Sequence, residues 1–355
     1  MNEHLFPYKW YLKNGYPSNE IAKNNLNVFG TFICGGGSTM GYKLAGYNHL
    51  GGVEIDKEVA KVYKLNHDPK YLFNEDIREF NKRQDLPSEL YSLDLLDGSP
   101  PCSTFSMAGS REKAWGKSKQ FREGQAVQTL DDLVFVYCDT IIKLQPKVFI
   151  LENVKGIIQG NAKVYSKNIV KKMTDAGYEV QVFCLNAASM GVPQKRERVF
   201  FIGHKKELKF KKLKLEFNEK PILFGEIKES ENGISIKGKM LDLWKVKLKG
   251  EKDLASACIR ETGARSYFGT RIQYDNEVPF TIIASDSSPV VHESKPFELN
   301  NNEIKKIGTY PLDYDFQTLQ PKYLIGMSVP PVMTAQIANQ MYLQWFKKSN
   351  NVMEM

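Results

Sequence analysis

Short apolar runs alternate with helical patterns through the first half of the chain, and this alternation is the feature that most constrains the fold. The runs expected to form strands cover residues 26–34, 52–56, 72–73, 93–96, 147–151, 180–185 and 199–202. Helical spacing of apolar residues covers 38–45, 57–66, 130–144 and 169–176. Short apolar strands that alternate with helices are typical of a doubly wound α/β sheet. We therefore predict an open, Rossmann-like sheet with helices on both faces.

The alternation stops after His204 and returns near Pro279. The segment between is polar and rich in lysine, which favours a smaller, inserted lobe over residues 205–277. A strand over 279–284 and helices over 302–308 and 334–346 then predict a return segment, 278–355, that completes the main domain, 1–204. Within the main domain, residues 1–25 are an N-terminal extension whose aromatic side chains we expect to pack on the C-terminal helix.

Charge and cysteine usage narrow the class of protein. The chain has 355 residues and a net charge of +8, from 49 basic and 41 acidic residues, which permits nucleic-acid binding without requiring it. Lys205–Lys252 contains many lysines and no arginine; this is either a solvated surface or a face that contacts phosphates. The five cysteines are scattered and form no CxxC pair, so we expect no metal, no disulfides and a cytoplasmic location. The sequence has no run of about 18 apolar residues, so we predict no membrane span.

A nucleotide pocket is predicted at the ends of the first three strands. The stretch TFICGGGSTMG, Thr31–Gly41, follows a strand and starts a helix, and its glycines would let a ligand approach the backbone. Glu54 and Asp76 end the next two strands, where carboxylates could accept hydrogen bonds from ribose hydroxyls and an adenine amino group. A glycine turn alone is weak evidence. The three features together, without a GxGxxG pattern, favour an adenosine cofactor that has no pyrophosphate.

Reactive side chains are predicted at the ends of the next two strands. Cys102 follows Pro100-Pro101, which would fix the direction of its thiol, and Glu152 ends the fifth strand. Taken alone, Cys102 could be an inert residue at a turn and Glu152 a helix cap. The long segment Ser103–Gln128 is basic and glycine-containing, and we expect a mobile lid that closes over a polyanion.

An alternating polar motif follows later in the chain, in the stretch QKRER. Its Gln194, Arg196 and Arg198 would share one face of a strand. Such a motif by itself is typical of a surface strand. Two arginines beside a cysteine and a glutamate would instead form a site.

Taken in order, these motifs resemble the bacterial type of DNA (cytosine-5)-methyltransferase. The motifs that carry the resemblance are FICGGGSTMG, VEID, DI at Asp76-Ile77, GSPPCSTFS, ENV at Glu152–Val154, LNAASMGVPQKRERVFFIG, PFTIIA and IGMSVPPVMTAQIA. They occur in the family's order and span nearly the whole chain. The resemblance implies an S-adenosylmethionine methyltransferase sheet with a target-recognition lobe at 205–277, acting on double-stranded DNA as a monomer. It also implies a role in a restriction-modification system, with a separate nuclease as partner, or as a solitary modification enzyme.

The resemblance also implies roles for individual residues. Cys102 would attack C6 of a flipped cytosine, Glu152 would bind N3 and the amino group, Arg198 would bind O2, and Arg196 would support the cysteine loop or a phosphate. The residues expected at the cofactor are Phe32, Gly36, Gly37, Glu54, Ile55, Asp76, Ile77, Pro101, Leu130, Ser328 and Val329. The residues expected at DNA are Ser103, Arg111, Lys113, Gln194, Arg260, Arg265 and Arg271.

Two positions depart from the family pattern. Cys34 stands where a glycine is usual, and Met327 stands where an asparagine is usual, near the methionine part of the cofactor. Neither change touches the reacting residues. Two alternatives stay open: an enzyme of the same type that acts on RNA, and a catalytically silent DNA-binding protein. The intact Cys102, Glu152, Arg196 and Arg198 argue against the second, while Met327 gives it slight support.

Overall fold

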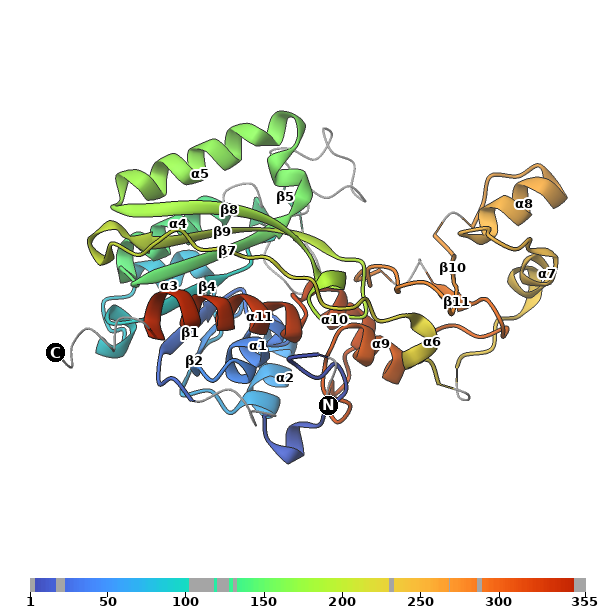
Figure 1. Ribbon diagram of the computed structural model, residues 1–355, viewed down its shortest axis with the longest axis horizontal. Helices are drawn as coiled ribbons and strands as arrows, with labels where there is room; N and C mark the ends of the chain where they lie inside the picture. The colour runs from blue at the N-terminus through green and yellow to red at the C-terminus, as the bar shows by residue number, and fades with distance from the viewer. Residues whose placement is uncertain are drawn as a thin grey trace. The chain divides into compact units, whose positions relative to one another are not determined.

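The chain is organised as two compact units (Figure 1). The computed structural model describes residues 4–16, 23–101, 118–119, 128–129, 133–229, 233–267, 269–285 and 289–347. Unit 1 comprises residues 1–15, 187–196 and 218–333, and unit 2 comprises residues 16–186, 197–217 and 334–355. The predicted lobe, 205–277, is therefore shared: residues 205–217 belong to unit 2 and residues 218–277 to unit 1.

Unit 2 is built on a seven-stranded sheet with the order β3-β2-β1-β4-β7-β9-β8. The strands are β1 Asn27–Thr31, β2 Asn48–Val53, β3 Tyr71–Phe73, β4 Leu95–Gly98, β7 Val148–Val154, β8 Tyr178–Asn186 and β9 Glu197–Lys205. Five of them pair in parallel, while β9 runs antiparallel to both β7 and β8. This sheet confirms the predicted doubly wound α/β architecture. Ser118–Lys119 (β5) and Gln128–Thr129 (β6) form a separate antiparallel pair.

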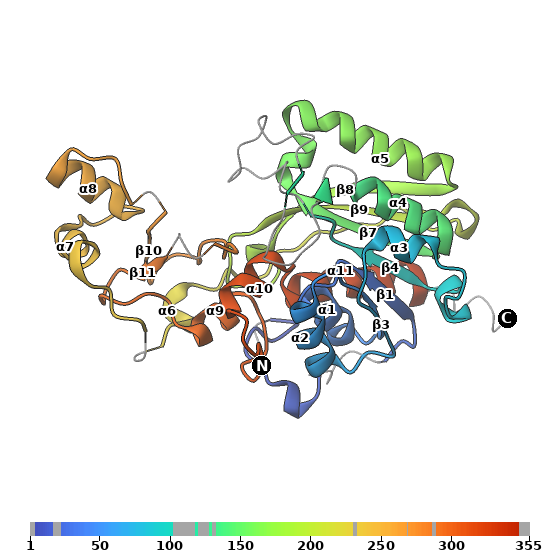
Figure 2. The ribbon, with the colours of Figure 1, turned by 180° about the vertical axis from the view of Figure 1, so that it is seen from behind.

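Helices cover both faces of the sheet (Figures 1 and 2). The helices are α1 Gly37–Leu44, α2 Lys57–His67, α3 Ile77–Lys82, α4 Leu133–Leu144 and α5 Lys163–Asp175. Helices α3, α4 and α5 form one layer, and α1 and α2 lie on the opposite face. Strand residues such as Phe29, Leu96 and Phe149 pack with Tyr137 and Ile141 of α4 in a fully buried cluster. Because central strands are buried on both faces, they read as continuous apolar runs in the sequence.

The order of the strands reverses between β1 and β4, which are direct neighbours in the sheet. Ligands of open α/β sheets bind at the carboxyl ends of the strands beside such a reversal. Strand β2 starts earlier than predicted and ends at Val53, so the predicted strand over 52–56 is wrong in its second half. The reason is that the carboxylate of Asp56 caps α2 by accepting from the N–H groups of Glu58 and Val59.

Unit 1 contains short helices, a small parallel strand pair and a helical return segment. Its elements are α6 Phe224–Ile227, α7 Gly238–Val246, α8 Leu254–Thr262, β10 Arg271–Gln273, β11 Val290–His292, α9 Asn301–Ile307 and α10 Pro321–Met327. A separate apolar cluster joins α7, α8, β10 and β11 through residues that include Leu243, Leu254, Ile272 and Val291. We refer to residues 233–299, which contain this cluster, as the lobe. Helix α11, Pro331–Met341, and the π-helical turn Tyr342–Phe346 confirm the predicted C-terminal helix.

One prediction for unit 1 is wrong. Residues 279–284 form no regular strand, because polar side chains from the QKRER motif bond to this segment in place of a neighbouring strand. The N-terminal residues contact the segment that follows α9 in the chain. The indole of Trp10 donates to the carbonyl oxygen of Thr309 at 3.0 Å, and the carboxylate of Asp313 accepts from the N–H of Leu12. The packing of residues 1–25 on the C-terminal helix stays a prediction.

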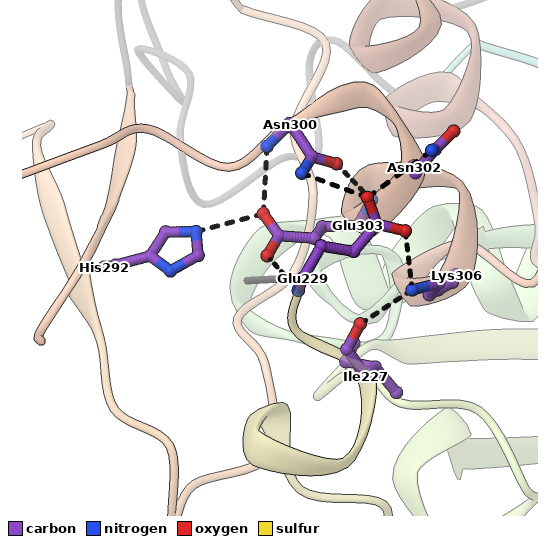
Figure 3. Close-up of polar contacts among 7 residues, drawn as sticks. All are labelled: Ile227, Glu229, His292, Asn300, Asn302, Glu303 and Lys306. Atoms are coloured by element: carbon purple, nitrogen blue, oxygen red, sulfur yellow. Dashed lines mark hydrogen bonds and ion pairs between the residues drawn. The ribbon is translucent and has the colours of Figure 1, made fainter. Parts of the chain in front are cut away.

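A buried polar network lies where the lobe joins α9 (Figure 3). The Glu303 side chain is fully buried, and its carboxylate accepts from the N–H groups of Glu229 and Asn300, each at 2.9 Å. His292 Nε2 lies 3.0 Å from Glu303 Oε2, and the ammonium of Lys306 pairs with Glu229 at 2.8 Å. One carboxylate thus binds both the segment that enters the lobe and the segment that leaves it.

Within the described part of the chain, no helix is long and apolar enough to cross a membrane. The same residues contain no group of three or more histidine, cysteine or acidic side chains that could hold a metal ion.

Candidate active site

The predicted cofactor turn between β1 and α1 has an unusual backbone. Phe32, Cys34 and Gly36 all have positive φ angles, of 55°, 48° and 77°. The N–H of Cys34 donates to Glu54 Oε2 at 3.0 Å, and the N–H of Gly36 donates to the carbonyl of Ile33 at 2.8 Å. Glycine is favoured wherever φ is positive, which gives a physical reason for glycine at the position of Cys34 in related sequences.

Gly36 is required by its surroundings as well as by its backbone angle. A Cβ atom placed there would lie 2.2 Å from Nε2 of His67, inside contact distance. The His67 ring is buried and packs 4.6 Å, centroid to centroid, from the ring of Tyr63. The turn and α2 therefore meet too closely for any side chain at this position.

Glu54 presents a buried carboxylate directly after β2. Its two oxygens accept from the N–H groups of Cys34 and Asp56, at 3.0 and 2.9 Å. Burial raises the pKa of Glu54 to about 7, although these backbone hydrogen bonds act in the opposite direction. Asp76 follows β3, caps α3 and pairs with Arg78 at 3.2 Å. Two carboxylates and a tight glycine turn at the strand ends fit the hydroxyl and amino groups of an adenosine cofactor.

The segment that leads toward Cys102 is anchored from two neighbouring strands. The side-chain amide of Asn153, which is 1% exposed, donates to the carbonyl of Pro100 at 3.4 Å. The hydroxyl of Thr31 donates to the backbone carbonyl of Asp97 at 3.2 Å. The predicted site residues Cys102, Ser103, Arg111, Lys113 and Leu130, and the predicted lid apart from β5 and β6, lie outside the described residues.

Asp97 is a buried acid that the sequence analysis did not assign to the site. It is 6% exposed in the middle of an apolar strand, and its carboxylate accepts from the hydroxyl of Tyr42 at 3.0 Å. Burial, with a smaller contribution from the charge of Glu152, raises the pKa of Asp97 to about 7 against the hydrogen bonds from Tyr42 and Ser38. The position of Asp97 inside the apolar run LDLLDG is the sequence signal that could have predicted a buried acid here.

Glu152 and Arg198 meet across two antiparallel strands. Glu152 pairs with Phe200 in the register of β7 and β9, so Arg198 is its diagonal neighbour on the same face. Arg198 Nε lies 2.9 Å from Glu152 Oε1, and their side chains are 15% and 12% exposed. Because Glu152 is in the strand and paired with an arginine, it does not serve as a helix cap.

Gln194 and Arg196 do not share a strand face with Arg198, because β9 begins only at Glu197. Arg196 is 2% exposed, and its guanidinium donates to the backbone carbonyls of Ile282, Gly326 and Ser328 at 3.1, 2.9 and 2.8 Å. The amide of Gln194 also points inward: it donates to the carbonyl of Ile307 and accepts from the N–H of Ile282. Gln194 and Arg196 therefore bond through their side chains to other backbone segments and do not extend strand β9.

The stretch IGMSVPP is held in place by these carbonyl contacts and by Tyr310, which the sequence analysis did not single out. The hydroxyl of Tyr310 donates to Ser328 Oγ at 2.7 Å. Gly326 approaches the backbone of Ala284 so closely that a Cβ atom would lie 2.4 Å from its nitrogen. Met327, which stands where the resemblance leads us to expect an asparagine, is 40% exposed.

Three of the four arginines predicted to contact DNA lie within the described residues, and they have different surroundings. The guanidinium of Arg260 is engaged by Glu251, by Glu261 and by the carbonyl of Val246. Arg265 is exposed, and Arg271 is exposed with its guanidinium carbon 5.4 Å from the centroid of the Phe280 ring.

The structure brings the predicted residues together in two sets, each within its own unit. In unit 2 these are the cofactor turn with Glu54, and the pair of Glu152 with Arg198. In unit 1 they are Gln194 and Arg196 with the backbone around Ser328.

Comparisons with known proteins identify the family. A model of the C-5 cytosine-specific DNA methylase family matches residues 26–343. The chain is 30% identical over 286 residues to the type II methyltransferase M.FnuDI of Fusobacterium nucleatum, covering 76% of this chain and 74% of that protein. It is 32% identical over 198 residues to the type II methyltransferase M.NgoPII of Neisseria gonorrhoeae, covering 55% of this chain and about half, 52%, of that protein.

Solved structures agree in fold. A DNA modification methyltransferase encoded within an Escherichia coli prophage superposes with a TM-score of 0.62 at 21% identity, covering 90% of this chain and 99% of that one. DNMT2 of Spodoptera frugiperda superposes with a TM-score of 0.64 at 16% identity, covering 90% and 100%. At these identities the likeness establishes the fold alone. The match of the family model over most of the sequence shows that the chain belongs to the C-5 cytosine-specific DNA methylase family.

Proposed function

We propose that this protein transfers a methyl group to C5 of a cytosine flipped out of double-stranded DNA, with Cys102 as the attacking thiolate. The observation that supports this most directly is the pair of Glu152 and Arg198, 2.9 Å apart on β7 and β9. Strand β7 lies beside β4, whose end leads through Pro100 and Pro101 to Cys102. A carboxyl group and a guanidinium on one face, next to a thiol, suit the N3, amino and O2 edge of cytosine.

Each side chain has a chemical task in this proposal. Cytosine C5 is a weak nucleophile, and addition of the Cys102 thiolate to C6 would place an electron pair on C5. Glu152, as a carboxylic acid, would donate a proton toward N3 as the adduct forms, and Arg198 would bind O2 and help to orient the glutamate. After transfer, loss of the C5 proton would return the electron pair and expel the Cys102 thiolate.

S-adenosylmethionine would supply the methyl group as an electrophile. The residues that would hold it are Phe32, Gly36 and Gly37 in the turn, Glu54 and Ile55 after β2, and Asp76 and Ile77 after β3. Pro101, Leu130, Ser328 and Val329 complete the proposed set. The buried contacts of Gln194 and Arg196 support a revised role, in which both position the backbone around Ser328 and neither touches the base.

The lobe is our candidate for reading the DNA sequence, with Arg265 and Arg271 exposed on it. Type II methyltransferases among the relatives support a role in restriction-modification, beside a separate nuclease in a bacterial cytoplasm.

DNA that contains 5-fluorocytosine tests the mechanism, because fluorine cannot leave as the C5 proton does. Wild-type protein with S-adenosylmethionine should form an adduct that survives denaturation, and Cys102→Ser should form none while still binding the cofactor. Glu152→Gln should form the adduct far more slowly but bind DNA nearly as well. An adduct that persists in Cys102→Ser would refute the proposal. An RNA substrate containing the same base, run in parallel, separates the RNA alternative.

A further inference from the structure

The ring of Phe280 in unit 1 lies beside two cationic side chains. Lys195 Nζ is 5.9 Å and the guanidinium carbon of Arg271 is 5.4 Å from the ring centroid. Phe280 is half-buried, whereas Lys195 and Arg271 are exposed. Lys195 belongs to the QKRER motif and Arg271 to β10 of the lobe, so the fold brings together cations that are distant in sequence.

Backbone and buried polar contacts hold this arrangement. The N–H of Lys195 donates to the carbonyl of Pro279 at 2.8 Å, and the hydroxyl of Thr281 donates to the carbonyl of Lys195. The N–H of Phe280 donates at 3.2 Å to the side chain of Gln273, which is fully buried. The ring is therefore presented by a fixed backbone, and the cations beside it start from fixed positions.

The charges at this site are poorly balanced. Lys195 pairs with Glu277 at 3.7 Å, but both side chains are nearly half exposed, and such pairs contribute little to stability. Among the described residues, no carboxylate forms an ion pair with Arg271. Each cation gains little stabilisation from the ring in an exposed setting. A phosphate beside either cation would be stabilised by its charge.

We infer that Lys195 and Arg271, each beside the ring of Phe280, contact phosphates of the DNA backbone. An arginine fork suits two phosphate oxygens, and a lysine adds a point charge. The inference rests on the proposed function. It deepens that function by assigning a backbone contact to Lys195, three residues before Arg198 in the chain, and by giving Arg271 a phosphate in place of a base edge.

The salt dependence of DNA binding tests these contacts. Each phosphate contact adds about 0.9 to the slope of log K against log salt. Lys195→Gln and Arg271→Gln should each remove about one unit of slope, so the affinity of either variant should fall about 3.5-fold less than that of wild type between 50 and 200 mM salt. Fluorescence anisotropy with labelled DNA duplexes of several unrelated sequences measures both the slope and its independence from sequence.

Three further variants separate charge from structure. Lys195→Arg and Arg271→Lys should retain the wild-type slope. Lys171→Gln, which removes an exposed lysine from α5, should leave the slope unchanged. A wild-type slope in both glutamine variants would overturn the inference, as would a loss of affinity confined to one DNA sequence. If wild-type protein binds no DNA at all, the proposed function itself fails, and this result is distinct from an unchanged slope.

Discussion

Replacement of Gly36 by alanine should weaken unit 2 and the cofactor turn together. The left-handed backbone at φ 77° costs an L-residue about 1–2 kcal/mol. In addition, the new Cβ would lie 2.2 Å from Nε2 of His67, and overpacking of this kind costs about 1–3 kcal/mol. The His67 ring has little room to move, because it is buried against Tyr63 and its Nε2 lies 3.3 Å from the carbonyl of Gly35. The free energy of unfolding should therefore fall by about 2–5 kcal/mol.

A matched glycine separates the two costs. Gly177, after α5 in unit 2, has a φ of 94°, and a Cβ atom there would meet nothing within 4 Å. Gly177→Ala should therefore show the backbone cost alone. Urea denaturation followed by circular dichroism gives the unfolding free energies, and calorimetric titration gives the affinity for S-adenosylmethionine. Only Gly36→Ala should lose affinity.

A double mutant checks the cause. Removal of the ring in Gly36→Ala/His67→Ala should relieve the clash, while the cost of the left-handed backbone at position 36 remains. The two substitutions should therefore be non-additive by about 1–3 kcal/mol. If Gly36→Ala costs no more than Gly177→Ala, or if the double mutant is additive, the steric explanation is wrong.

Three other outcomes are expected. Because the pKa of Glu54 is raised from 4.5 to about 7, its contribution to stability is present below pH 4.5 and is lost as the pH rises through 7. Cofactor binding that needs the ionised carboxylate should instead tighten over the same pH range. Glu54→Gln should flatten both pH profiles, the first measured by thermal melts and the second by titration with S-adenosylmethionine. Arg196→Met should lower the free energy of unfolding of unit 1 by at least about 3 kcal/mol, because three buried carbonyls lose their donor, and Arg196→Lys should recover only part of this in urea melts. Glu303→Ala should increase hydrogen exchange of amides in the lobe, but not in the seven-stranded sheet, and Glu303→Gln should have a smaller effect.

The sheet could be predicted from the sequence because its signals are local. Each strand is a short apolar run, and each helix repeats its apolar positions with helical spacing, so the order of elements follows from the pattern alone. The positions of Glu54 and Glu152 at strand ends followed from the same reasoning. Their hydrogen-bond and ion-pair partners did not: the sequence predicted that Glu152 and Arg198 share a site, and the structure shows that they form an ion pair.

The errors arose where side chains replace backbone ladders. The stretch PFTIIA has the composition of a strand, yet the N–H and C=O groups of its Ile282 are bonded by the side chains of Gln194 and Arg196 from a distant segment. Hydropathy cannot distinguish this from a ladder. The acid at Asp97 was missed for a similar reason, since its partner, Tyr42, is far from it in sequence.

The network around Glu303 has a consequence for how such a chain can change over time. Because one carboxylate bonds to both Glu229 and Asn300, the two ends of the lobe segment start and finish at one point on α9. A segment whose ends meet can be lengthened, shortened or exchanged while the rest of the chain keeps its path. The lobe also has its own apolar cluster, so a replacement needs to bring only its own interior. Under the proposed function, in which the lobe reads the DNA sequence, this junction would let new DNA specificities be acquired by exchange of the lobe, with the chemistry inherited unchanged.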